Sequence, residues 1–245
     1  MPSTALKGIF RSLRIYHGDK AQAQAKDQLY GKFLRPNDLA FDIGAHVGDR
    51  ISSFRRLGAR VVALEPQPLA FRALQLIHGT DSEVTLIQAV CGENDEPVTL
   101  RVNSANPTVS SASNEFITAA NSAPNWQQEN WDTALKVPSM TLERLLSQYG
   151  MPTFVKIDVE GYEALILSYL ETRIPALSFE FTTIQRQIAL DCIRYLQAIG
   201  DYKFNVSLGE SCSMLYEQNQ PAAQIRQLIT QMDHSANSGD IYAVL

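Results

Sequence analysis

Short apolar runs alternate with helical patterns from residue 37 to the end of the chain. Five runs have strand length and are rich in β-branched or aromatic residues, which predicts strands over residues 39–43, 60–64, 84–89, 154–158 and 176–181. Apolar residues at helical spacing predict helices over residues 51–57, 69–77, 162–170 and 184–199. Because strands and helices alternate, the pattern predicts an α/β domain with a mostly parallel sheet and right-handed crossovers.

Ligands of such sheets bind outside the carboxyl ends of the strands. The residues that follow Ile43, Leu64, Ala89 and Ile157 are therefore candidate site positions before any motif is considered.

Residues 1–36 differ in charge from the rest of the chain. They carry seven Lys or Arg residues against Asp19 and Asp27, a net charge of +5, and since the whole chain carries −5 the remainder carries −10. We interpret them as a basic helical leader that packs on a catalytic domain spanning residues 37–245. A peripheral contact of this leader with a membrane surface or an acidic partner is the alternative.

Residues 103–136 interrupt the strand and helix pattern. They are rich in Asn, Ser, Ala and Thr and contain both tryptophans, Trp126 and Trp131. Connections of this length are uncommon in a compact domain and are usually functional or mobile. The sequence therefore predicts either a lid or substrate loop over the acceptor pocket, or a surface insertion whose tryptophans cover an apolar patch.

Composition narrows the class of protein. Hydrophobic residues make up 45% and charged residues 19% of the chain, an ordinary globular balance, and the net charge of −5 argues against a nucleic-acid binder. Cys91, Cys192 and Cys212 are odd in number and widely spaced, which argues against a disulfide framework or a zinc site. No signal peptide or membrane span is evident, so we expect a cytoplasmic protein.

The strongest local motif begins at the end of the first predicted strand. The sequence places Asp42 before Gly44-x-x-x-Gly48, and two glycines here allow a tight turn whose amides approach a bound cofactor. A dinucleotide-binding loop has the different spacing Gly-x-Gly-x-x-Gly. A purely structural strand-to-helix turn is the alternative interpretation.

A carboxylate follows at the end of the second predicted strand. Glu65 comes 17 residues after Gly48, where a carboxylate can accept two hydrogen bonds from the vicinal hydroxyls of a ribose. Loop, strand and acid in this order favour a cofactor that contains adenosine.

Charged residues also gather near the fourth predicted strand. Lys156, Asp158 and Glu160 alternate along its end, and the sequence places them on one face or in one cluster at the rim. Glu163 is interpreted as part of a surface ion pair. Glu180 lies inside an apolar run, where a carboxylate is normally paired or functional.

These motifs together resemble the FkbM family of S-adenosylmethionine-dependent methyltransferases. The resemblance covers about residues 37–245 and rests on five blocks in order: FDIGAHVG at 41–48, ALEP at 63–66, AVCG at 89–92, SMTLE at 139–143 and KIDVEGYE at 156–163. Two positions depart from the family pattern: His46 replaces an asparagine, and the segment 74–79 lacks one.

The resemblance implies a class I methyltransferase fold, a Rossmann-like seven-stranded sheet with flanking helices and an antiparallel last strand near residues 241–245. It also implies a set of cofactor-binding residues. They are Asp42, Gly44, Ala45, His46 and Gly48 toward methionine and ribose, Glu65 and Pro66 at the ribose, Ala89 and Val90 at the adenine, and Asp158 toward the reactive methyl group.

The resemblance implies methyl transfer to a hydroxyl of a sugar, glycan or natural product. Asp158 is the first candidate for the general base and His46 the second. Glu160, Glu180, Trp126 and Trp131 are candidates for acceptor binding, and indole faces favour a carbohydrate. A divalent cation on Asp158, Glu160 and Glu180 is a less favoured alternative, because no spacing signature supports a metal site. A nicotinamide-dependent oxidoreductase and a cofactor-binding protein without transferase activity are the rival functions.

Overall fold

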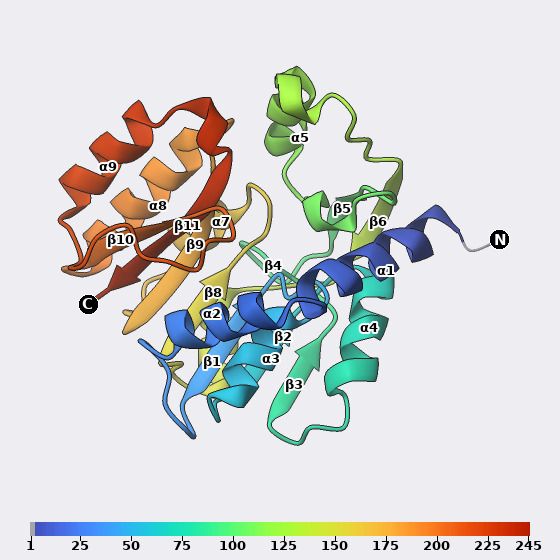
Figure 1. Cartoon of the computed structure of the whole chain (residues 1–245), viewed down its shortest axis with the longest axis horizontal. Helices are drawn as coiled ribbons and strands as arrows, with labels where there is room; N and C mark the ends of the chain where they lie inside the picture. The colour runs from blue at the N-terminus through green and yellow to red at the C-terminus, as the bar shows by residue number, and fades with distance from the viewer. Residues whose placement is uncertain (1–2) are drawn as a thin grey trace.

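A seven-stranded sheet forms the centre of the molecule (Figure 1). The computed structural model describes residues 3–245. The strand order is β3-β2-β1-β8-β9-β11-β10, and β11 runs antiparallel to both of its neighbours while the other pairings are parallel. The strands are β1 Leu39–Ile43, β2 Arg60–Leu64, β3 Val84–Ile87, β8 Phe154–Ile157, β9 Ala176–Thr182, β10 Lys203–Leu208 and β11 Ser238–Val244. The predicted α/β fold is confirmed.

Helices cover both faces of the sheet because alternate residues of each strand point to opposite faces. In β1, Phe41 packs with one face, where α6 Leu142–Tyr149, α7 Glu163–Ser168, α8 Arg186–Ile199 and α9 Ala222–Gln231 lie. Ala40 packs with the other, where α3 Asp49–Arg56 and α4 Pro68–His78 lie. The strands β1, β2, β8, β9 and β11 are largely buried. Because both faces of these strands are covered, their sequences are nearly continuous apolar runs.

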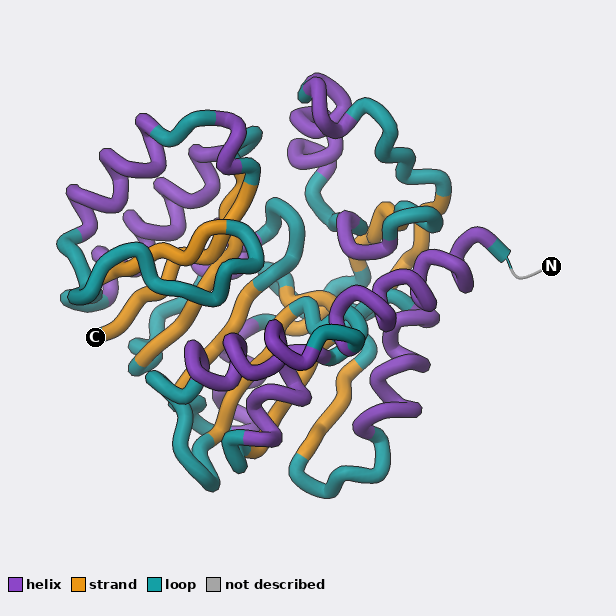
Figure 2. The backbone as a smooth tube through the Cα atoms, viewed as in Figure 1, coloured by secondary structure: helices purple, strands orange, loops and turns teal. Residues whose placement is uncertain are grey.

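Two helices form within the leader, α1 Thr4–His17 and α2 Lys20–Tyr30. Ser3 caps α1 and Asp19 caps α2 through side-chain bonds to backbone amides. Leu29 and Tyr30 are buried in the core beside α3, and His17 Nε2 lies 2.8 Å from the carbonyl of Val47. Figure 2 shows both helices lying across the near side of the domain.

The segment 103–136 has its own secondary structure. It contains η1 Pro107–Val109, α5 Asn114–Ser122 and η2 Pro124–Trp126, and it starts and ends on the antiparallel pair β5 Val98–Val102 and β6 Thr133–Val137. We call this segment the excursion; it projects at the upper right of Figures 1 and 2. Beneath it, β4 Val90–Cys91 pairs in parallel with β7 Ser139–Met140.

None of the helices formed by residues 3–245 combines the length and the apolar character that a membrane crossing requires.

Candidate active site

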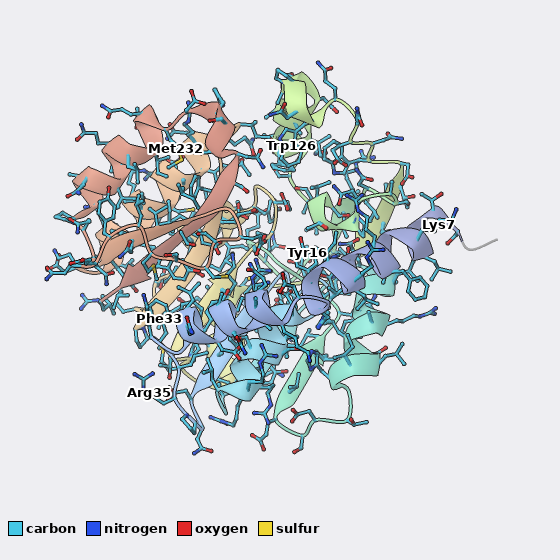
Figure 3. All side chains as sticks on the ribbon, viewed as in Figure 1. Lys7, Tyr16, Phe33, Arg35, Trp126 and Met232 are labelled. Atoms are coloured by element: carbon cyan, nitrogen blue, oxygen red, sulfur yellow. The ribbon has the colours of Figure 1, made fainter. Side chains whose placement is uncertain are left out.

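A cavity of about 240 Å³ opens at the carboxyl ends of β1, β2, β8 and β9. Its wall combines the turn after β1, the end of β2, the excursion, the turn after β8 and the start of β11. Two aromatic residues reach it from peripheral elements, Tyr16 from α1 and Trp126 from η2 (Figure 3). The switch in strand order between β1 and β8 falls at the same place, as expected for ligand sites of open α/β sheets.

The turn after β1 needs glycine for both backbone and steric reasons. Gly44 has φ +88° and Gly48 has φ +82°, values that residues with a Cβ rarely adopt. A Cβ on Gly44 would collide with the backbone carbonyl of Asp158. The glycine therefore lets the turn after β1 lie directly against the turn after β8, so the two halves of the cavity meet there.

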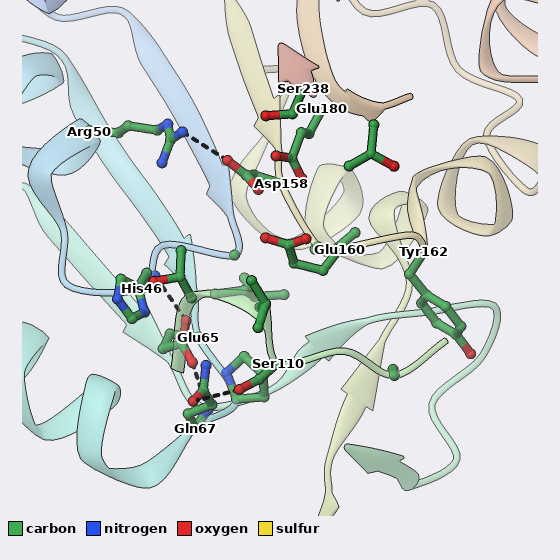
Figure 4. A pocket seen from close by; sticks show the side chains of 18 of the residues that line it. His46, Arg50, Glu65, Gln67, Ser110, Asp158, Glu160, Tyr162, Glu180 and Ser238 are labelled. Carbon is green, nitrogen blue, oxygen red and sulfur yellow. Dashed lines mark hydrogen bonds and ion pairs between the residues drawn. The ribbon is translucent and has the colours of Figure 1, made fainter. Parts of the chain in front are cut away.

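Glu65, at the end of β2, is held by backbone amides. Its Oε2 accepts a hydrogen bond from the His46 N–H at 2.9 Å, and its Oε1 accepts one from the Gln67 N–H at 2.7 Å (Figure 4). Burial raises the pKa of Glu65 to about 8 although these bonds oppose the shift. Each carboxylate oxygen accepts a single bond from the described residues and retains a second acceptor site for a hydroxyl.

The Gln67 side chain ties the excursion to the end of β2. Its Nε2 donates to the carbonyl of Pro107 at 2.9 Å, and its Oε1 accepts from the Ser110 hydroxyl at 3.2 Å. The excursion thus forms a wall of the cavity that is fixed by hydrogen bonds at its base.

Asp158 lies between two cations. Its Oδ2 is 2.8 Å from an Arg50 guanidinium nitrogen and 3.2 Å from Lys156 Nζ, which also lies 2.6 Å from Asp240 Oδ1. Burial opposes ionisation of Asp158, but Lys156 and Arg50 prevail and hold its pKa at about 2. Burial disfavours the charged Lys156 too, yet Asp158 and Asp240 raise the pKa of this fully buried ammonium.

Glu160 and Glu180 complete an acidic cluster with Asp158. One carboxylate oxygen from each of the three residues lies within 4.8 Å of the other two. Burial, then repulsion from Asp158, raises the pKa of both Glu160 and Glu180 well above the ordinary range. Among residues 3–245, neither glutamate has an ion pair with a basic side chain.

Two further polar groups lack partners. Both ring nitrogens of His46 are buried without a hydrogen bond to residues 3–245, and burial lowers its pKa to about 4, so the ring is neutral at pH 7. Tyr16 packs edge-on against this ring at 5.8 Å between centroids. Both carboxyl oxygens of Asp42 are likewise buried and unpaired within the described part of the chain, and burial raises its pKa to about 7.

The structure brings most of the predicted site residues to the cavity wall. Those that line it are Gly44, His46, Glu65, Pro66, Ala89, Val90, Trp126, Asp158, Glu160 and Glu180. Asp42, Ala45 and Gly48 are buried in or next to the same turn and do not line the cavity. Trp131 faces away: its indole N–H donates to the carbonyl of Val109 at 2.8 Å and its ring packs against Phe116.

The prediction that Glu163 forms a surface ion pair is wrong. Glu163 is buried, and its carboxylate accepts hydrogen bonds from the amides of Val159 and Gly161, each at 3.0 Å. These bonds fix the turn that follows β8. Glu163 is at the first position of α7, where a carboxylate is favoured by the exposed amides of the helix end.

The residues of the wall that the sequence did not single out include Tyr16, Arg50, Tyr162 and Asp240. The sequence could have indicated Asp240, because this acid adjoins the apolar run at the end of the chain, just as Glu180 lies within an apolar run. Arg50 also had one, since the first turn of the helix after a glycine loop faces the site. Tyr16 comes from a leader whose docking has no local sequence signal.

Comparison with known proteins identifies the family. A family model described as the methyltransferase FkbM domain matches residues 42–234. The chain belongs to the FkbM methyltransferase family. The resemblance stated from the sequence is thereby confirmed, and the protein is a methyltransferase that depends on S-adenosylmethionine.

Solved structures of methyltransferases are distantly similar to this FkbM protein. The O-methyltransferase of Bacillus cereus in complex with SAH is 10% identical, with TM-score 0.48 over 100% of this chain and 92% of that one. Fibrillarin of Aeropyrum pernix with natively bound S-adenosyl-L-methionine is 11% identical, with TM-score 0.48 over 90% and 74%. No curated protein sequence matches the chain.

The residues present fit the cofactor of the FkbM family. Glu65 retains acceptor sites for hydroxyl groups at the end of β2, and the Gly44 turn allows close approach of a ligand to the backbone. Ala89 and Val90 supply a small apolar wall beside them. The unpaired ring nitrogens of His46 offer a further polar contact.

Proposed function

We propose that this FkbM protein transfers a methyl group to a hydroxyl of a sugar, glycan or polar natural product. The observation that carries the proposal is the shared cavity, in which the Glu65 side and the acidic side meet at Asp158. The net charge of −5 supports a small-molecule or carbohydrate acceptor over a nucleic acid.

The cofactor side would orient S-adenosylmethionine, which supplies an electrophilic methyl group on its sulfonium when bound. We assign the turn from Gly44 to Gly48, with Asp42 behind it, to the methionine and ribose. Glu65 accepts from the ribose hydroxyls, while Ala89 and Val90 contact the adenine. Fixing the two reactants in line can contribute several kcal/mol to the rate, and the rigid turn serves that role.

The acceptor side combines carboxyl groups with aromatic rings. Trp126 and Tyr162 line the same cavity as Glu160 and Glu180. Carboxylates accept hydrogen bonds from sugar hydroxyls, and aromatic faces pack on sugar rings. This composition supports a carbohydrate or another polyhydroxylated acceptor.

The acceptor hydroxyl must lose its proton as its oxygen bonds to carbon and the sulfur–carbon bond breaks. Asp158 stays ionised at neutral pH because Lys156 and Arg50 pair with it, so it can accept a hydrogen bond from the hydroxyl and orient it. Its low pKa makes it a weak proton acceptor. His46, neutral and unpaired on both nitrogens, remains the second candidate for that step, although its pKa of about 4 makes it a weak base too.

The test is a transfer assay with S-adenosylmethionine that carries a ¹³C-labelled methyl group. Purified protein is incubated with fractionated polysaccharides, sugars and natural-product alcohols, with a protein-free reaction as control. We expect a ¹³C signal at the chemical shift of a methyl ether in at least one fraction. A label found only on nitrogen or carbon would overturn the O-methyl assignment.

A further inference from the structure

The three carboxyl groups of the acidic cluster converge from two adjacent strands. Asp158 directly follows β8, Glu160 lies in the next turn and Glu180 projects from β9. One oxygen from each lies within 4.8 Å of the other two. Figure 4 shows the carboxyl groups facing one another across the same part of the cavity.

The nearby cations do not balance this cluster. Lys156 lies between Asp158 and Asp240, and Arg50 pairs with Asp158, so these two cations serve two carboxylates. Glu160 and Glu180 have no ion pair with any basic group among residues 3–245. The ion pairs of the described residues therefore leave the carboxyl groups of Glu160 and Glu180 without a positive partner.

Glu160 gives an independent indication of a ligand. The residue is 8% exposed, and its side chain accepts no hydrogen bond from the part of the chain that the structure describes. Its carboxyl group points into the space beside Asp158 and Glu180 (Figure 4). The backbone of Glu160 is fixed, since the Ser111 hydroxyl donates to its carbonyl at 2.6 Å. Buried polar groups are normally satisfied by a partner.

We propose that Asp158, Glu160 and Glu180 bind one hard divalent cation, Mg²⁺ or Mn²⁺. Three carboxylate oxygens without nitrogen or sulfur donors form the ligand set that these ions prefer, and both ions retain open positions for further oxygens. The Asp158 ion pairs use Oδ2, which leaves Oδ1 for the cation.

The role of the cation rests on the proposed function, whereas its binding does not. In a methyltransferase that uses a hydroxyl acceptor, an open position on the cation would take the acceptor oxygen. The cation lowers the pKa of a hydroxyl that it binds. That effect would compensate for the weak basicity of Asp158.

The test is titration of chelator-treated, full-length protein with Mn²⁺, in which electron paramagnetic resonance reports the free ion. We expect one saturable site per chain, competed by Mg²⁺, with affinity at least about tenfold weaker in the Glu160→Gln/Glu180→Gln variant. The matched control is Glu93→Gln/Glu96→Gln, which removes the same charge from an exposed turn and should bind like the wild type. Equal binding by all three proteins, or none by the wild type, would overturn the site.

A second measurement covers the case in which the glutamine variant fails to fold. Tb³⁺ is added to the otherwise unaltered chain and excited through tryptophan. Since Trp126 lines the cavity and Trp131 does not, Trp126→Phe should reduce the emission more than Trp131→Phe. Equal reduction would contradict a site in this cavity. Separate titration with S-adenosylhomocysteine shows whether the cofactor assignment, rather than the cation site, has failed.

Discussion

The buried carboxyl groups on the two sides of the cavity have different kinds of partner. On the cofactor side, Glu65 is held by backbone amides that lie within a few residues of it or in the adjacent turn. On the acceptor side, Asp158 is held by side chains from α3 and β8, and Glu160 and Glu180 have no basic partner in the described chain. The first side is a rigid frame of local geometry, while the second depends on charges that the tertiary fold brings together.

The largest expected effect is at the turn where both sides meet. Gly44→Ala places a Cβ against the Asp158 carbonyl and at φ +88°, so we expect the free energy of unfolding to fall by more than about 4 kcal/mol. Gly150→Ala is the control, because Gly150 has φ +92° but open space around it, and should cost about 1–3 kcal/mol. Denaturant unfolding measures both. Equal losses would mean that the contact between the turns does not matter.

The next largest effect concerns the charges of the acceptor side. Lys156→Met leaves Asp158 and Asp240 without their shared ammonium, and breaking such a buried pair should cost about 3 kcal/mol. Arg194→Met breaks an exposed pair with Asp191 and should cost less than about 1 kcal/mol. Thermal unfolding measures both variants. Equal losses of stability would mean that the buried ion pairs of the acceptor side do not stabilise the fold.

Asp42 gives a smaller effect that depends on pH. Its pKa in the folded protein is about 7 and its ordinary value is 3.8, so the folded state binds more protons between these values. Stability contributed by the protonated form is therefore lost as pH rises from about 4 through 7. Asp42→Asn removes this loss. Its unfolding free energy should decline less steeply than that of the wild type between pH 4 and 8, and parallel curves would contradict the assignment.

The smallest expected effect separates the two sides directly. Trp126→Ala alters the acceptor wall and leaves the turn after β1 and Glu65 untouched, so affinity for S-adenosylhomocysteine should stay within about twofold of the wild type. Calorimetric titration measures it. A large loss would show that the excursion also forms part of the cofactor site.

The same division explains what the sequence could predict. Alternation of strands and helices predicted the sheet. Gly44 and Glu65 were identifiable because each lies at the end of a predicted strand in a motif of recognisable spacing, although the contact of Gly44 with Asp158 is visible only in the fold. The strand β10 was not predicted, and β11 begins at Ser238, earlier than the predicted residue 241. Apolar runs therefore identified the central strands but not β10, and the bounds expected for β11 came from the family resemblance alone.

Partners on the acceptor side were not predictable in this way. Arg50 and Asp240 reach the Asp158–Lys156 cluster from α3 and β11, and the pairing emerges only from the fold. Trp126 and Trp131 lie in one segment and both pack edge-on against Phe116, yet only Trp126 lines the cavity. Local patterns do not decide which side of a loop faces a pocket.

The most direct test of the account is calorimetric titration with S-adenosylhomocysteine, with NAD as the control ligand, on the wild type, Glu65→Gln and Glu180→Gln. We predict one site per chain for S-adenosylhomocysteine and none for NAD. Affinity should fall at least about tenfold in Glu65→Gln, because an amide nitrogen replaces one of the two carboxyl oxygens that would bind the ribose hydroxyls, and should be largely retained in Glu180→Gln. Binding of NAD instead, or equal affinity in Glu65→Gln and the wild type, would contradict the assignment of the cofactor side.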